Sequence, residues 1–143
     1  MRPDEKHQIA ALVHLYASLL DEGNLDGVAA LFEHAELRST RSNRVLRGAV
    51  EARTMYDPVI IYDDGTPSTV HQITNLQVEI DGDTATARST FTVLQVTGQG
   101  LHPILSGEYR DRFARNEHGW HFTERVFDPK LIGDLSRHMR NAT

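Results

Sequence analysis

Apolar residues recur at helical spacing near the start of the chain. From Ile9 onward they fall three or four positions apart, so one stripe of a helix beginning near Asp4 can face a core. Gly23 is expected to end this helix, and a second, shorter helix is expected over residues 25–32 with Asn24 as its N-cap. The stripe of the first helix consists of Ile9, Leu12, Val13, Tyr16, Leu19 and Leu20.

The middle of the chain mixes several patterns. Residues 35–40 predict a short strand, and residues 48–61 predict a third helix, although Pro58 interrupts the helical pattern. Residues 63–67 are rich in turn-forming residues and predict a loop. Regular strands are expected only after this loop.

The second half of the chain alternates between apolar and polar residues, as strands do. In the strand expected over residues 69–80, uninterrupted alternation places His71, Ile73 and Asn75 on one side. Val70, Thr74, Leu76, Val78 and Ile80 then lie on the other side. Further strands are expected over 84–97, 104–115 and 119–127, joined by turns at 81–82 and 116–118.

Helices followed by sequential, hairpin-linked strands predict an α+β fold in which the helices cover one face of the sheet. The length of 143 residues suits one domain, which we place at residues 1–143. Within it, residues 128–143 are expected to form a C-terminal tail or short helix, because apolar residues from Pro129 to Met139 follow an amphipathic pattern. Such a helix would dock on a pocket mouth or on a neighbouring subunit.

Composition excludes several classes of function. The net charge of −5 argues against a nucleic-acid partner, and we interpret the basic run from Arg38 to Arg47 as solvated, with an anionic ligand as the alternative. Without cysteine there is no disulfide, thiolate nucleophile or iron–sulfur ligand. His118 and His121 would point to opposite faces of a strand, so no metal site is expected. No apolar run is long enough to span a bilayer, and we expect a cytoplasmic protein.

Three residues are candidates for acid–base chemistry. Asp21 sits at the C-terminal end of the first helix, where the helix dipole disfavours a carboxylate, and His71 lies on a predicted strand. An Asp–His pair can orient an imidazole and balance its charge, while the hydroxyl of Tyr16 holds a substrate oxygen. The alternatives are a solvated helix end, a structural histidine and a core tyrosine.

The motif Tyr16-x4-Asp21, the run Thr69-x-His71-x3-Asn75 and the run Gly107-x-Tyr109-x-Asp111-x-Phe113 resemble the SnoaL-like, polyketide-cyclase branch of the nuclear transport factor 2-like superfamily. The resemblance implies a cone-shaped α+β barrel with a deep, cofactor-free pocket, and a homodimer or homotrimer. It also implies a pairing of Asp21 with His71, as in the dehydratase members. Tyr16 matches the tyrosine of the bile-acid dehydratases.

Three hypotheses follow for the function. The first is a cofactor-independent lyase or isomerase acting on a hydrophobic carbonyl or hydroxyl compound such as a steroid, polyketide or aromatic metabolite. Its catalytic residues would be Asp21, His71 and Tyr16. The second is a pocket that binds a small molecule without converting it. The third is a structural subunit resembling the small subunit of ring-hydroxylating oxygenases. The residues assigned to substrate binding are Asn75, Arg125, Phe91 and Tyr56.

Overall fold

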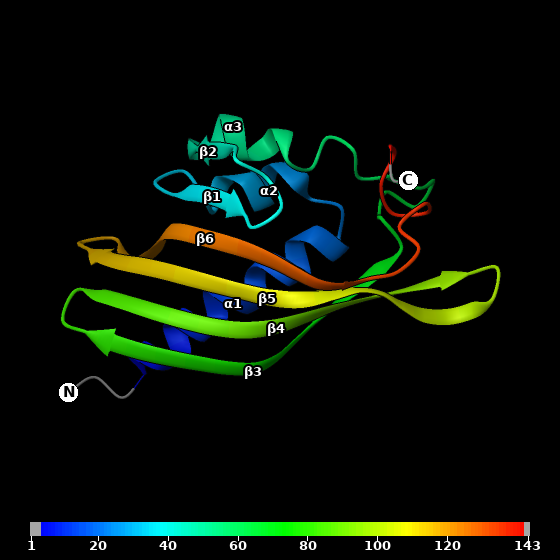
Figure 1. Cartoon of the computed structure of the whole chain (residues 1–143). Helices are drawn as coiled ribbons and strands as arrows, with labels where there is room; N and C mark the ends of the chain where they lie inside the picture. Colours follow the sequence, from blue (N-terminus) through cyan, green and yellow to red (C-terminus); the bar gives the residue numbers. More distant parts are fainter. Residues whose placement is uncertain (1–3, 142–143) are drawn as a thin grey trace.

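The computed structural model describes residues 4–141 and shows an α+β fold in which short helices precede a long sheet (Figure 1). The predicted fold class is thereby confirmed. The helices are α1 (Glu5–Asp21), α2 (Leu25–Ala30) and α3 (Gly48–Thr54). The strands are β1 (Glu36–Ser39), β2 (Val45–Arg47), β3 (Thr69–Asp81), β4 (Thr84–Thr97), β5 (Gly100–Asn116) and β6 (Gly119–Ile132).

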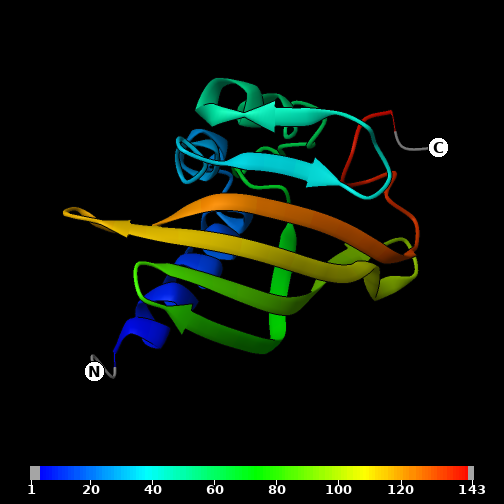
Figure 2. The same ribbon diagram turned by 60° about the vertical axis from the view of Figure 1, so that its left-hand side comes forward.

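The strands form one open, curved sheet in the order β2-β1-β6-β5-β4-β3. Neighbouring strands are antiparallel except for β1 and β6, which run parallel. Figures 1 and 2 show α1 on one side of the sheet, where it packs mainly on β3, while α2, α3, β1 and β2 lie beyond β6. The predicted meander of four strands is confirmed, and the β1–β2 pair extends it on the β6 side.

Helix α1 forms where the apolar stripe predicts it. Ile9, Val13, Tyr16 and Leu20 are all buried, and the helix ends just before Gly23. Gly23 has a φ of +79°, and a side chain there would collide with the backbone of Gly65. The positive φ and this close approach both require glycine, and the contact fixes the loop of residues 63–67 beside the end of α1.

Helix α2 begins as the sequence predicts. The side chain of Asn24 caps it by accepting a hydrogen bond of 2.8 Å from the backbone N–H of Gly27. The helix ends at Ala30, and turns continue the chain to β1.

A β-bulge in β3 corrects the predicted sidedness of that strand. Asn75 has a φ of +53°, and the pairing of β3 with β4 shifts its register between Thr74 and Gln77. One extra residue at this point switches the faces of the strand. His71 and Ile73 therefore lie on the same, inner side as Leu76, Val78 and Ile80, and Asn75 is exposed.

Two other predictions were wrong in the middle and at the end of the chain. The third helix ends at Thr54, well before Pro58, and the strand β2 was not anticipated because it has only three residues. Residues 128–143 were expected to form a tail or a short helix, and the described residues contain no helix there. Strand β5 extends to Gly100 and pairs with β6 as far as Ile132, so the first part of that tail is sheet. Residues 133–141 then fold back in turns.

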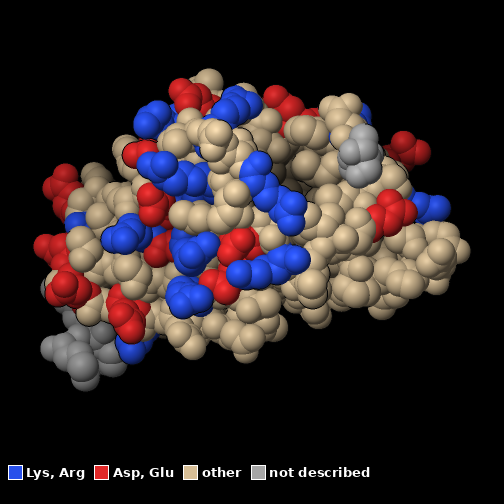
Figure 3. Space-filling view, viewed as in Figure 1, with Lys and Arg blue, Asp and Glu red and all other residues tan. Residues whose placement is uncertain are grey.

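The outer face of the sheet carries interleaved charges of both signs (Figure 3). Arg38, Arg112 and Glu124 form cross-strand ion pairs, and Arg110 pairs with Asp128. Ion pairs between neighbouring strands are the usual arrangement of alternating charges on a solvated sheet face. Among the described residues, no helix is long and apolar enough to cross a membrane.

Candidate active site

A cavity of about 220 Å³ lies between α1, the inner face of the sheet and the C-terminal residues 135–139. Its wall is mostly apolar and includes Leu20, Val59, Phe91 and Val93. No Lys, Arg, Asp or Glu of the described residues lines it. The polar side chains in the wall are those of Tyr16, Ser39, Tyr56, His71, Tyr109 and His138.

Asp21 and His71 form a tightly coupled pair at this cavity. Asp21 Oδ1 is 2.6 Å from His71 Nδ1, and Asp21 Oδ2 accepts a hydrogen bond of 2.7 Å from the backbone N–H of His71. Thr69 Oγ1 also donates to Asp21 Oδ1 at 2.9 Å. The carboxylate thus holds Nδ1 as the protonated nitrogen, which leaves Nε2 of His71 as the basic nitrogen.

Asp21 remains ionised in this position. Burial raises the pKa of its carboxyl group. The hydrogen bond and charge of His71, together with the bonds from the His71 backbone and Thr69, lower the pKa by more than burial raises it. Asp21 is therefore a carboxylate at neutral pH, and it can stabilise an imidazolium on His71. The side chain of His71 is only 5% exposed, so little water competes for this pair.

Replacing His71 with glutamine is expected to raise the pKa of Asp21. The variant loses the ring hydrogen bond and the histidine charge, whereas the burial that raises this pKa persists. A carboxyl group whose pKa is lowered in the folded state stabilises the fold at pH values above the pKa of the unfolded chain. This stability is lost as the pH falls through the lowered pKa. Because the variant has less of this stabilisation, its acid unfolding should begin at higher pH. Carbon-13 NMR titration of the carboxyl group measures the pKa directly.

Asp64 is a suitable internal control in the same titration. Its pKa is lowered by the backbone and side-chain hydrogen bonds of Thr66, and neither bond involves His71. An unchanged Asp21 titration in the His71→Gln protein would show that the two groups are not coupled.

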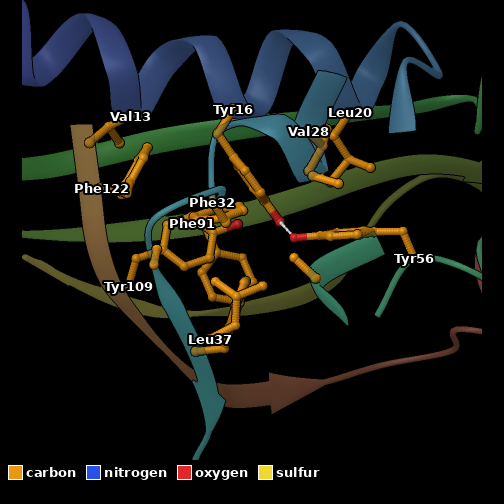
Figure 4. Packing of buried hydrophobic residues seen from close by; sticks show 14 of the residues in the cluster. Val13, Tyr16, Leu20, Val28, Phe32, Leu37, Tyr56, Phe91, Tyr109 and Phe122 are labelled. Carbon is orange, nitrogen blue, oxygen red and sulfur yellow. Dashed lines mark hydrogen bonds between the residues drawn. The ribbon is translucent and has the colours of Figure 1, made fainter. Parts of the chain in front are cut away.

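A pair of tyrosines provides the second polar feature of the cavity. The hydroxyls of Tyr16 and Tyr56 are 2.8 Å apart, and Figure 4 shows the two side chains pointing toward one another from α1 and from the segment after α3. Burial raises the pKa of both phenols and outweighs the charge of Arg125, which lowers the pKa of each. Both hydroxyls are therefore protonated. One proton closes the hydrogen bond between them, and the other can be donated to a ligand oxygen or to Tyr109, whose side chain also interacts with the Tyr16 hydroxyl.

The structure assigns different positions to the four residues expected to bind substrate. Tyr56 and Phe91 line the cavity, whereas Asn75 and Arg125 do not. Asn75 lies exposed on the bulge of β3. Arg125 is completely buried, where it pairs with Asp111 and lies 4.4 Å from the ring centroid of Tyr16. The expected substrate contacts of Asn75 and Arg125 are thus corrected.

Sequence reasoning missed the part of the wall that comes from the C-terminal residues. Leu135, His138 and Met139 line the cavity, although they lie in turns and not in the expected helix. The apolar pattern of the tail was a valid signal that it docks at the pocket mouth. Nothing in the pattern singled out His138.

The chain is similar to one family of domains and to several proteins of solved structure. The model of the SnoaL-like domain family matches residues 2–126. No curated protein sequence matches.

Among solved structures, an NTF2-like protein with a cystatin-like fold from Novosphingobium aromaticivorans is 21% identical, with a TM-score of 0.75 over 94% of this chain and 86% of that chain. A variant of Rv3472, a protein of unknown function from Mycobacterium tuberculosis, is 28% identical, with a TM-score of 0.74 over 90% of this chain and 73% of that chain. A candidate scytalone dehydratase from N. aromaticivorans is 21% identical, with a TM-score of 0.72 over 91% of this chain and 87% of that chain.

Proposed function

Because this chain belongs to the SnoaL-like domain family of the NTF2-like superfamily, we propose that it is a cofactor-independent acid–base enzyme, a lyase or isomerase acting on a small carbonyl compound. The observation that carries the proposal is the 2.6 Å contact between Asp21 and His71 at the wall of an apolar cavity. A structural neighbour described as a candidate scytalone dehydratase is compatible with this chemistry.

His71 is the proposed general base. Its Nε2 accepts a proton from the carbon next to the substrate carbonyl, and the electron pair of the broken C–H bond moves toward the carbonyl oxygen to form an enolate. The resulting imidazolium is balanced by the Asp21 carboxylate, which does not touch the substrate and acts as a positioning residue. In a substrate with an adjacent double bond, the imidazolium returns the proton to the far carbon of the dienolate, which gives isomerisation. In a substrate with a β-hydroxyl, the electron pair returns from the enolate oxygen, the C–O bond breaks, and the imidazolium proton leaves with the hydroxyl as water, which gives dehydration.

The tyrosine pair is the proposed oxyanion site. The Arg125 guanidinium lies 4.4 Å from the ring centroid of Tyr16, and its charge opposes the burial that raises the pKa of Tyr16. We assign Tyr56 as the donor to Tyr16, so that the Tyr16 proton is aimed at the enolate oxygen. A donor already in place within an apolar cavity stabilises charge that develops in the transition state without having to reorganise.

The cavity restricts the substrate. Its volume of about 220 Å³ lies below the roughly 300–1,000 Å³ typical of ligand pockets, so a compound with one or two rings suits it better than a steroid. Because no charged side chain lines it, an uncharged substrate avoids the cost of burying an unpaired ion.

Deuterium exchange tests the proposal without knowledge of the natural substrate. Acetophenone and 1-indanone are small neutral ketones, and loss of their α-proton signals in D₂O can be followed by proton NMR. We expect exchange at neutral pH to be faster with the protein than in buffer alone and proportional to protein concentration. Exchange at the buffer rate for both ketones would contradict the proposal and favour a ligand-binding role.

A further inference from the structure

His138 is a buried histidine whose imidazole lacks a hydrogen-bond partner. The residue is 5% exposed, and its Nδ1 is buried and unpaired. Within residues 4–141, neither ring nitrogen bonds another residue. A buried polar group left unsatisfied destabilises a protein, so such a group calls for an explanation.

The backbone around His138 is fixed on both sides. The His138 carbonyl accepts a hydrogen bond of 2.8 Å from the N–H of Ile60, and the Arg137 carbonyl accepts one of 3.1 Å from the side chain of Gln95. The Tyr62 hydroxyl donates to the same Arg137 carbonyl, and Met139 forms a bridge with Val59. The imidazole is therefore held in place by the fold and is not the loose end of a tail.

The imidazole lies in the wall of the cavity beside His71. The two rings meet edge to face with centroids 6.2 Å apart, and His138 lines the cavity together with Leu135 and Met139. Burial, reinforced by the His71 charge, lowers the pKa of His138 to about 4, against a smaller opposing effect of Asp21. His138 is therefore neutral near pH 7, with one nitrogen that donates and one that accepts.

We propose that His138 is a ligand-binding residue that hydrogen-bonds a second oxygen of the ligand, while the tyrosine pair holds the first. The ligand class is then a small, uncharged ring compound with two oxygen functions, such as a hydroxyketone. This inference rests on the proposed function, because it names the substrate of the same cavity. The ring nitrogen available to a ligand hydroxyl is Nε2, which is not fully buried and makes no hydrogen bond to the described residues.

Matched ligands test the inference in the whole protein. Dissociation constants of acetophenone and of its 2-, 3- and 4-hydroxy isomers are measured by NMR titration. We expect at least one isomer to bind about tenfold more tightly than acetophenone, which is the factor expected for one added hydrogen bond. In the His138→Phe variant, which keeps a ring but loses both nitrogens, this preference should disappear while the affinity for acetophenone changes little.

The His138→Gln variant retains a polar group at the position and should retain part of the preference. It also serves as the test if His138→Phe does not fold. In the wild-type protein, the ring-nitrogen signals of His138 should shift when the preferred isomer saturates the site.

A preference that persists in His138→Phe would overturn the inference. So would unmoved His138 nitrogen signals or the absence of any preferred isomer in the wild type. Failure of deuterium exchange with an intact hydroxyl preference would contradict the proposed reaction alone, so the two failures are distinguishable.

Discussion

Replacing His71 with glutamine is expected to lower the rate of protein-catalysed deuterium exchange into acetophenone by about 10²–10⁴-fold, the usual contribution of a positioned general base. Glutamine fills a similar space but does not accept a proton near neutral pH. The initial rate of α-proton loss, measured by NMR at saturating ketone, gives the effect. The variant should still bind the ketone, because the tyrosine pair and the apolar wall are unchanged.

Asp21 is tested separately because it acts through His71. In the Asp21→Asn variant the amide oxygen can still accept from Nδ1, but the bond from the His71 backbone N–H and the negative charge that stabilises the imidazolium are lost. We therefore expect kcat to fall by at least about tenfold with KM nearly unchanged. A purely structural role of Asp21 would instead disturb binding and stability together.

Asp26 provides the matched control for Asp21. It is another aspartate of the N-terminal helices, its side chain is 93% exposed, and it pairs with Arg53 at 3.0 Å. Asp26→Asn should leave the exchange rate unchanged. If His71→Gln exchanges as fast as the wild type, His71 is not the base and the proposed mechanism fails.

Local pattern was sufficient to predict the parts of the site that lie on α1. A helix fixes which residues share a face, so the buried stripe correctly placed Tyr16 inward. The position of Asp21 near the helix end was likewise predictable, because Gly23 marks the end. Its contact with His71 was only a hypothesis from the sequence, since the residues are 50 positions apart and their approach depends on how α1 packs on β3.

Other features of the site depend on tertiary structure that periodicity does not encode. The bulge at Asn75 adds one residue to β3, so the side chains after it change faces. A prediction from strict alternation therefore assigns the residues on the two sides of the bulge to different faces. His138 reaches the cavity only because residues 137–140 form hydrogen bonds with the segment before β3 and with Gln95 of β4. Neither the bulge nor the docking of residues 137–140 produces a periodic pattern in the sequence.

Arg125 illustrates why an arginine within an alternating strand is ambiguous. A sequence does not show whether such a side chain meets a ligand or a buried acid. Here its guanidinium makes bonds of 2.7 and 3.0 Å to the two carboxylate oxygens of Asp111, and both side chains are fully buried. Burial alone would lower the pKa of Arg125, but Asp111 raises it above its ordinary value, so the arginine is charged.

Removing the partner of this buried cation is expected to cause a large loss of stability. In Asp111→Leu the guanidinium keeps its charge but loses both of its bonds to Asp111, and the Nη1 atom already lacks a partner. Breaking a buried ion pair in this way costs about 3–5 kcal/mol in the free energy of unfolding. Chemical denaturation of the variant, compared with the wild type, measures the loss.

The double variant Asp111→Leu/Arg125→Met separates the cost of an unpaired charge from the cost of lost packing. Replacing both partners with apolar residues removes the burial penalty of the charges, so the double variant should be more stable than Asp111→Leu alone. Glu124→Gln, which disrupts exposed pairs with Arg38 and Arg112, should cost less than about 1 kcal/mol. If Asp111→Leu costs no more than Glu124→Gln, the prediction is wrong and the buried pair does not stabilise the core beneath Tyr16.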